Sequence, residues 1–145
     1  MQKPKILVVE GDEIHLQKAV CVLEEAGLEV IVARSALEGI RKIQAGGIDG
    51  IITGVFMAHD GGGPRDAAKY PCGIEVTLAA QKFNVPFIVC IAGDCHGPRY
   101  EWIWSLGFRL QWPEMVDRKN SENPNHEAKE KNWGYALSRL KGLLQ

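Results

Sequence analysis

Cysteine, histidine and aspartate side chains gather in two Gly-rich stretches of this 145-residue chain. Asp94, Cys95 and His96 directly follow the apolar run PFIVCIA. A second set lies in or beside the stretch AHDGGGPRDAAKYP at residues 58–71, and comprises His59, Asp60 and Cys72. Cysteine and histidine are zinc ligands, and a Cys/His pair can act as nucleophile and base. Because no CxxC or HxxxH spacing accompanies them, a small metal-binding or Cys/His-dependent enzyme is the alternative hypothesis.

Acidic residues follow the first apolar run, ILVV, as Glu10 and Asp12 on either side of Gly11. Carboxylates at the end of a strand are hard oxygen ligands of the kind that divalent cations prefer. Together with Asp94 they would form a small acidic cluster. Asp12 also stands where an aspartate caps a following helix, and we favour that interpretation. We therefore expect no metal or other cofactor, and Glu10 and Asp12 are the candidates if a cation binds.

The elements that position these side chains alternate between strands and helices. Continuous apolar runs at residues 5–10, 28–33, 48–54, 86–92 and 108–112 predict five buried strands. A helical pattern follows each of them, the last from about residue 125. This alternation predicts an α/β fold with a five-stranded parallel sheet, flavodoxin-like order 2-1-3-4-5 and helices on both faces. In such sheets, functional groups gather at the carboxyl ends of the strands.

Length and composition predict one globular domain over residues 1–145, with a long loop at 58–71 and a polar loop at 114–124. Hydrophobic residues make up 46% of the chain, and the net charge of −1 favours neither nucleic acid nor a membrane as partner. No segment approaches the roughly 20 apolar residues of a membrane span, and the first apolar run is too short for a secretory signal. We therefore expect a cytoplasmic protein.

Several segments resemble, in order and spacing, the receiver domain of bacterial two-component response regulators. These segments are ILVVEGDE, IDGIITGVFMA, VPFIVCIA and LGFRLQWP, so that the resemblance extends from about Lys5 to Pro113. Met57-Ala58 is similar to the Met-Pro of the family. The resemblance implies the flavodoxin-like fold and a role in signal transduction of the two-component or phosphorelay type.

The chemistry implied by this resemblance is largely missing from the sequence. Receivers hold Mg²⁺ with an acidic pair, which falls here on Glu10 and Gly11, with Asp12 one residue later. The aspartate that accepts the phosphoryl group ends the third strand, five residues after the position of Asp49, and falls on Gly54. Glycine cannot be phosphorylated.

The two remaining features also depart from the family pattern. The hydroxyl residue after the fourth strand, which contacts the phosphoryl group, falls on Ile91. The lysine that precedes a proline after the fifth strand falls on Trp112. Neither an isoleucine nor a tryptophan replaces a hydroxyl donor or an ammonium group. We interpret the chain as a degenerate receiver that has no phosphorylation switch.

Aromatic residues are concentrated where receivers most often meet their partners, on the fourth helix, the fifth strand and the fifth helix. The predicted partner-binding residues are Tyr100, Trp102, Trp104 and Trp112. Trp102 and Trp104 are two residues apart, so both cannot face inward from one helix, and tryptophan is enriched in protein–protein hot spots. We therefore predict a non-enzymatic protein-interaction module that works without phosphorylation, with a homodimer through this face as one form of the interaction.

Overall fold

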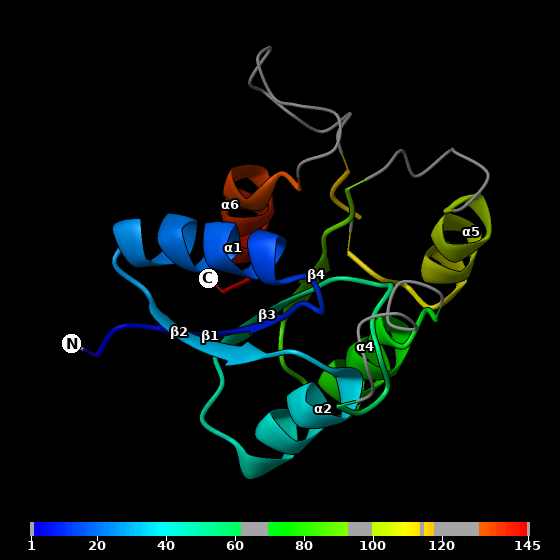
Figure 1. The fold of residues 1–145 in the computed structure, drawn as a ribbon, viewed down its shortest axis with the longest axis horizontal. Helices are drawn as coiled ribbons and strands as arrows, with labels where there is room; N and C mark the ends of the chain where they lie inside the picture. Colours follow the sequence, from blue (N-terminus) through cyan, green and yellow to red (C-terminus); the bar gives the residue numbers. More distant parts are fainter. Residues whose placement is uncertain (1, 62–69, 93–99, 114, 118–130, 145) are drawn as a thin grey trace.

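The computed structural model of the chain describes residues 2–61, 70–92, 100–113, 115–117 and 131–144 (Figure 1). The predicted loops at 58–71 and 114–124, and the predicted helix start near residue 125, lie partly or wholly outside these residues. Asp94, Cys95 and His96 also lie outside them. The strands are β1 (Lys5–Val9), β2 (Glu29–Ala33), β3 (Gly50–Thr53) and β4 (Phe87–Val89). The helices are α1 (Glu13–Glu25), α2 (Ala36–Ala45), α4 (Gly73–Lys82), α5 (Glu101–Arg109) and α6 (Trp133–Leu144).

The four strands form one parallel sheet in the order β2-β1-β3-β4. Val8 at the centre of the sheet pairs with Val32 of β2 on one side and with Ile52 of β3 on the other. Figure 1 shows α1 and α6 on one face of this sheet and α2 and α4 on the other, with α5 beyond the β4 edge. The predicted α/β class, the parallel sheet and the coverage of both faces by helices are confirmed.

The prediction of a fifth strand at residues 108–112 is wrong, since the described residues form four strands. Phe108 and Arg109 complete α5 instead, and Gly107, whose place suggests a helix stop, lies inside that helix. Glycine is needed there because a Cβ at Gly107 would lie 2.5 Å from Cε3 of Trp112. The glycine therefore admits the indole ring and does not end the helix.

The fifth position of the sheet begins later in the chain. Val116 forms a single parallel bridge with Cys90 beside β4. The N–H of Val116 donates to the carbonyl of Val89 at 2.8 Å, and the N–H of Ile91 donates to the carbonyl of Val116 at 2.9 Å. Residues 115–117 thus extend the sheet beyond β4, where the fifth strand of the predicted order belongs.

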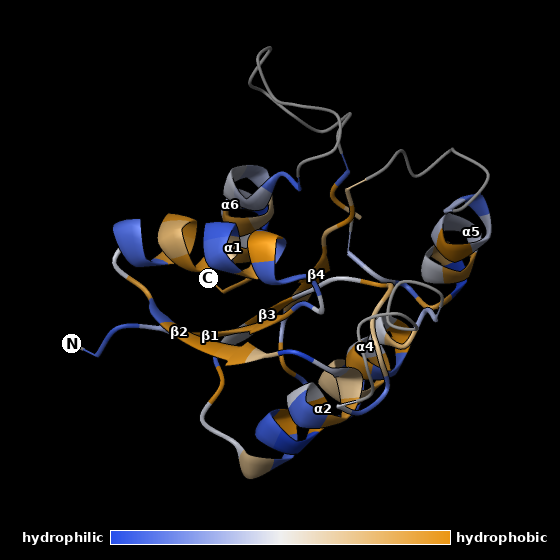
Figure 2. Cartoon of the chain, in the orientation of Figure 1, coloured by the Kyte–Doolittle hydropathy of each residue, from blue (hydrophilic) through white to orange (hydrophobic). Residues whose placement is uncertain are grey.

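Side chains of each strand alternate between two hydrophobic layers, as the period of a strand requires. Ile6, Val8 and Ile52 pack under α1 and α6, whereas Leu7 and Ile51 pack under α2 and α4. Figure 2 shows the strands in hydrophobic colours and hydrophilic colours on parts of α1 and α2. Because both faces of the strands are buried, continuous apolar runs are correct signals for them.

Helix caps fix where the chain leaves the sheet. Asp12 accepts a hydrogen bond from the N–H of His15 at 3.0 Å and so caps α1, as the sequence predicts. Ser35 caps α2 through the N–H of Glu38. None of the helices in the described part of the chain is long and apolar enough to cross a membrane.

Candidate functional site

Glu10 and Gly54 lie side by side at the carboxyl ends of β1 and β3. The N–H of Gly54 donates to the carbonyl of Val9 at 2.9 Å, which continues the pairing of the two strands. Glu10 is buried, with 3% of its surface exposed. One of its carboxylate oxygens, Oε1, accepts the N–H of Asp12 at 3.1 Å. The side chain of Glu10 is thus held over the end of the sheet.

The other carboxylate oxygen of Glu10, Oε2, receives a hydrogen bond from the ammonium of Lys131. The pair is buried, since the side chains of Lys131 and Glu10 are 8% and 3% exposed. Lys131 stands two residues before α6, and Asn132 between them accepts the N–H of Tyr135 at 3.2 Å. This cap at the start of α6 sets the place from which Lys131 reaches the pocket.

The ammonium of Lys131 occupies the space next to Gly54. A Cβ at Gly54 would lie 2.6 Å from Lys131 Nζ and 2.8 Å from Glu10 Oε2, distances that Cβ atoms do not adopt. We use the name Glu10–Lys131 pocket for the group formed by Glu10, Gly54 and Lys131. Only a residue without a side chain fits at position 54 while the ion pair stays where it is.

The electrostatics of the pocket keep the lysine charged. Burial lowers the pKa of the Lys131 ammonium, but the adjacent carboxylate of Glu10 more than offsets this, and the pKa is raised above its usual value. Nζ also lies 5.4 Å from the ring centroid of Trp133, at a distance suited to a cation–π contact. Removing either charge would leave the other one buried without its partner, which is the costly arrangement.

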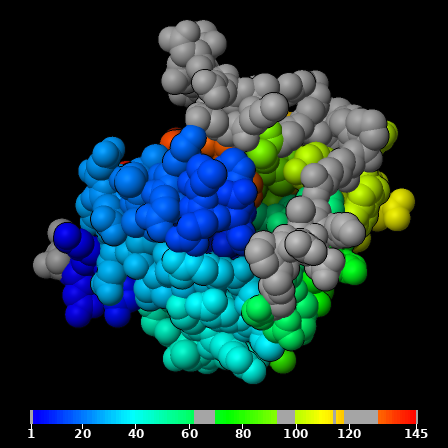
Figure 3. Space-filling view, in the orientation of Figure 1, coloured from blue at the N-terminus to red at the C-terminus, as the bar shows by residue number. Residues whose placement is uncertain are grey.

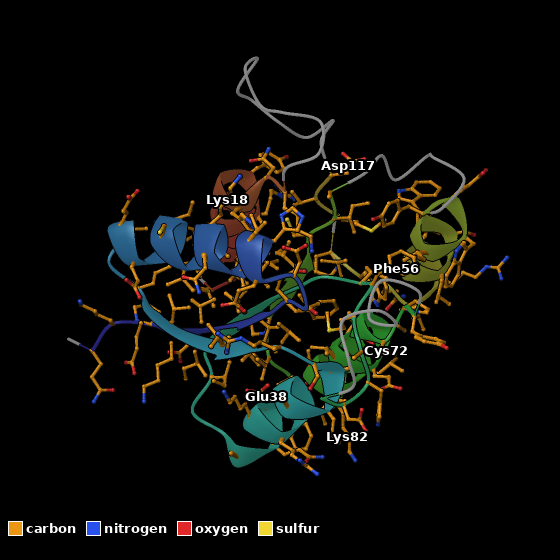
Figure 4. All side chains as sticks on the ribbon, in the orientation of Figure 1. Lys18, Glu38, Phe56, Cys72, Lys82 and Asp117 are labelled. Carbon is orange, nitrogen blue, oxygen red and sulfur yellow. The ribbon has the colours of Figure 1, made fainter. Side chains whose placement is uncertain are left out.

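Cys90, at the end of β4, lies near the same charges. Burial raises the pKa of its thiol to about 12, although the positive charge of Lys131 acts in the opposite direction. The negative charges of Glu10 and of Asp117, which is labelled in Figure 4, raise it further. A thiol with this pKa stays protonated near neutral pH and is a poor nucleophile.

The structure places the other predicted pocket residues differently. Gly11 lies against Met57, whose Cβ would be 3.1 Å from a Cβ at residue 11. Ile91 is buried in the hydrophobic layer on the α2 and α4 side. Trp112 is not among the residues at the pocket. Its ring packs edge-on against Phe87 with the centroids 6.5 Å apart, and Phe87 begins β4 at the end away from the pocket.

Lys131 is the functional candidate that the sequence interpretation missed. The predicted helix start near residue 125 placed Lys131 inside a helix rather than before one. The useful signal was Asn132, a residue type preferred at the helix N-cap, followed by the first inward-facing residue, Trp133. A lysine directly before such a cap lies at the sheet end of its helix, since α6 starts near the carboxyl ends of the strands (Figure 1).

The described residues contain no cluster that would support the metal-binding form of the Cys/His hypothesis. No group of three His, Cys, Asp or Glu side chains suited to a metal ion occurs among them. His59 pairs with Glu75 of α4, with 2.6 Å between Nδ1 and Oε2. Cys72 precedes α4 (Figure 4), and burial, followed by the charge of Glu75, raises the pKa of its thiol. Asp60 directly follows His59 in the stretch at residues 58–71.

The aromatic residues of α5 are partly exposed. Trp102 and Trp104 are 49% and 43% exposed, and Phe108 is 79% exposed. The rings of Trp104 and Phe108 stack with centroids 6.3 Å apart. We call these three side chains the α5 aromatic surface. Tyr100 differs from them, because its ring packs edge-on against Phe56 with centroids 5.5 Å apart.

Comparisons with known proteins identify the fold. No protein-family model matches the sequence, and no curated protein sequence matches it. Among solved structures, a CheY-like response regulator receiver domain from Methanospirillum hungatei matches with a TM-score of 0.67 and 16% identity, covering 99% of this chain and 94% of its own. The receiver domain of Francisella response regulator 1452 matches with a TM-score of 0.66 and 20% identity, covering 98% and 97%.

A third structure agrees with these two. It is a two-component response regulator from Clostridium difficile, with a TM-score of 0.65, 18% identity and coverage of 98% of this chain and 96% of its own. Identities this low carry the fold and not the activity. The chain has the fold of response regulator receiver domains.

Proposed function

We propose that this chain is a receiver-type signalling module that acts through protein contacts and without aspartyl phosphorylation. The observation that carries the proposal is Gly54 at the carboxyl end of β3. Glycine has no carboxylate that could accept a phosphoryl group. The space that a side chain would need there is already filled by the ammonium of Lys131. The pocket is therefore built around an internal ion pair, and phosphoryl transfer has no acceptor at this place.

A signalling role is supported by what the similar structures are called. They are described as response regulators or receiver domains, and their fold covers nearly the whole of this chain. Receivers transmit signals by protein contacts rather than by turning over a substrate. We extend that role to this chain as part of the proposal, and we expect no enzymatic activity.

The α5 aromatic surface is the proposed contact for the partner protein. Two half-exposed tryptophans and a more exposed phenylalanine on one short helix form an apolar group that water solvates poorly. Figure 3 shows α5, in yellow-green, at the margin of the molecule where a partner has access to it. Tryptophan side chains contribute strongly to binding energy when a partner buries them.

Phosphorylation is tested directly by incubating the purified chain with acetyl phosphate and Mg²⁺ and measuring its intact mass. We expect no phosphoryl adduct and no change in the backbone amide spectrum. A stable adduct on any Asp or Glu side chain of the pocket would contradict the proposal. A working receiver treated in parallel shows that the donor is active.

The contact surface is tested with the variant W102A/W104A, and F83A serves as the matched control. Phe83 directly follows α4, outside the α5 aromatic surface, and is 43% exposed, the same fraction as Trp104. Partners captured from a lysate of the source organism, and any self-association seen by sedimentation, should be lost with W102A/W104A and kept with F83A. Equal loss with both variants would refute the role of α5.

A further inference from the structure

Receiver domains imply a Mg²⁺ ion at the carboxyl ends of the central strands, and the residues of this chain do not fit one. Mg²⁺ requires near-octahedral coordination by hard oxygen ligands. Glu10 offers a carboxylate, but Gly11 and Gly54 offer none. Asp12 uses one carboxylate oxygen to cap α1. The remaining oxygen of Glu10, Oε2, is already bonded to the ammonium of Lys131.

We propose that Lys131 is a tethered cation that takes the place of the metal ion in the Glu10–Lys131 pocket. Removing the charge of Lys131 would free Oε2 of Glu10 and strengthen the binding of a divalent cation relative to wild type, although Gly11 and Gly54 still supply no ligand. This inference rests on the proposed function for the identity of the pocket, although it makes no use of the α5 aromatic surface.

The charge balance of the pocket supports this role. Glu10 is buried, and a positive partner offsets the cost of burying a carboxylate charge. In a metal-binding pocket the ion would supply that charge, whereas here the ammonium supplies it from the start of α6. A divalent ion at Glu10 would meet the positive charge of Lys131 at close range in a poorly solvated site, where like charges repel strongly.

The fit of the lysine to the pocket supports it as well. The nearest atom to a Cβ at Gly54 would be Nζ of Lys131, and the next would be Oε2 of Glu10. The two ends of the ion pair thus meet above the backbone of Gly54. Nζ of Lys131 lies over the ring of Trp133, 5.4 Å from its centroid. The ammonium is therefore held by a cation–π contact as well as by the carboxylate of Glu10.

The test is a Mg²⁺ titration followed through the backbone amides of Glu10 and Gly54. Wild type and the charge-conserving control K131R should show no saturable shifts. K131M, which keeps an apolar stem and removes the charge, should bind Mg²⁺ roughly tenfold or more tightly than wild type. E10Q/K131M should lose that binding, because the carboxylate is gone. Saturable Mg²⁺ binding to wild type, or the absence of saturable amide shifts in K131M, would overturn the proposal.

A second measurement uses the wild-type protein alone, so the proposal stays testable if K131M does not fold. Lysines are acylated with a water-soluble acetylating reagent, and each site is quantified by mass spectrometry. Lys131 should react roughly tenfold or more slowly than Lys141, which is exposed on α6. Millimolar Mg²⁺ should leave both rates unchanged. Rapid labelling of Lys131, or labelling that Mg²⁺ accelerates, would show that the ammonium does not hold the pocket.

The outcomes separate this inference from the proposed function. A phosphoryl adduct would refute phosphorylation independence whatever the Mg²⁺ titration gives. Wild type that binds Mg²⁺ but accepts no phosphoryl group would refute the tethered cation and leave the proposed function standing. The binding of partners to the α5 aromatic surface does not depend on either result.

Discussion

The buried pair of Glu10 and Lys131 gives a stability prediction with a definite size. K131M leaves a buried carboxylate without its cation, and E10Q leaves a buried ammonium without its anion. Removing one member of a buried ion pair typically costs about 3–5 kcal/mol. E10Q is well suited to this test because its amide oxygen can still accept the N–H of Asp12, which lies 3.1 Å from Oε1. Each single variant should therefore lose about 3–5 kcal/mol of unfolding free energy.

The double variant separates the pairing from the effects of each substitution. E10Q/K131M contains no unpaired buried charge, so it should cost less than either single variant and far less than their sum. Domains of this size have unfolding free energies of about 5–15 kcal/mol, so the loss is a large share of the total. At about 2–4 °C per kcal/mol, the midpoint of thermal unfolding of each single variant should fall by about 6–20 °C.

Urea unfolding followed by tryptophan fluorescence measures these free energies, because Trp133 is buried beside Lys131 and becomes exposed on unfolding. K131R is the control, since it keeps the positive charge. Two results would refute the reasoning. One is a cost below about 1 kcal/mol for K131M, the value of an exposed ion pair. The other is additivity of the single variants within about 0.5 kcal/mol.

Further predictions concern the close contacts and the pH dependence. G54A should destabilise the protein by about 1–3 kcal/mol, because its Cβ would push apart Glu10 and Lys131. The same substitution should cost less in K131M than in wild type, and urea unfolding of the four proteins measures the difference. The pKa of Lys131 is raised on folding, so the contribution of its charge to the unfolding free energy should be complete below pH of about 10.4, the ordinary lysine pKa. That contribution should be lost as the pH rises through the higher folded pKa. If the difference in unfolding free energy between wild type and K131M stayed constant over this pH range, the prediction would be contradicted. G107A should cost about 1–3 kcal/mol, since its Cβ meets the ring of Trp112, and an unchanged thermal midpoint would show that the ring moves freely. D12A should cost about 1 kcal/mol through the lost cap of α1, measurable as a lower urea midpoint with an unchanged slope.

The central sheet was predictable because burial on both faces leaves a simple signal in the sequence. β1 and β3 are short runs, and their central residues are apolar and fully buried. The start of α2 was equally clear, since Ser35 and Glu38 have the spacing of a capping box. Ser35 accepts the N–H of Glu38 as that motif predicts, whereas the Glu38 carboxylate accepts the N–H of Arg34. Buried strands and helix caps depend on residues close together in the chain, and so they can be predicted from the sequence.

The prediction of the fifth strand failed because the segment LGFRLQW suits both a strand and a helix. Short apolar runs cannot be assigned by periodicity alone. What decided the outcome is the contact of Gly107 with Trp112, which is a tertiary fit between a helix and the turn that follows it. The resemblance to receivers then placed the expected lysine on Trp112, because its register was counted from the wrong strand.

Lys131 was beyond the reach of a position-by-position comparison for a related reason. It lies 121 residues from Glu10 along the chain, and only the packing of α6 against the sheet brings the two together. A search for a cation at a fixed distance after a strand cannot find one that arrives from the next helix. The sequence shows that an acid remains at Glu10, and a buried acid calls for a cation somewhere, but not which residue supplies it.

The lack of a side chain at Gly54 and the position of the Lys131 ammonium depend on each other. A carboxylate side chain at residue 54 would need the space that Nζ now fills, so the ammonium of Lys131 would have to move. With glycine there, the ammonium can pair with Glu10, and on our proposal it supplies the charge that a metal ion would supply. It follows that an aspartate restored at residue 54 would meet a pocket that already contains a cation and has lost the second acid to Gly11. Under the proposed function, the filled pocket would exclude phosphoryl transfer in addition to the missing acceptor at residue 54.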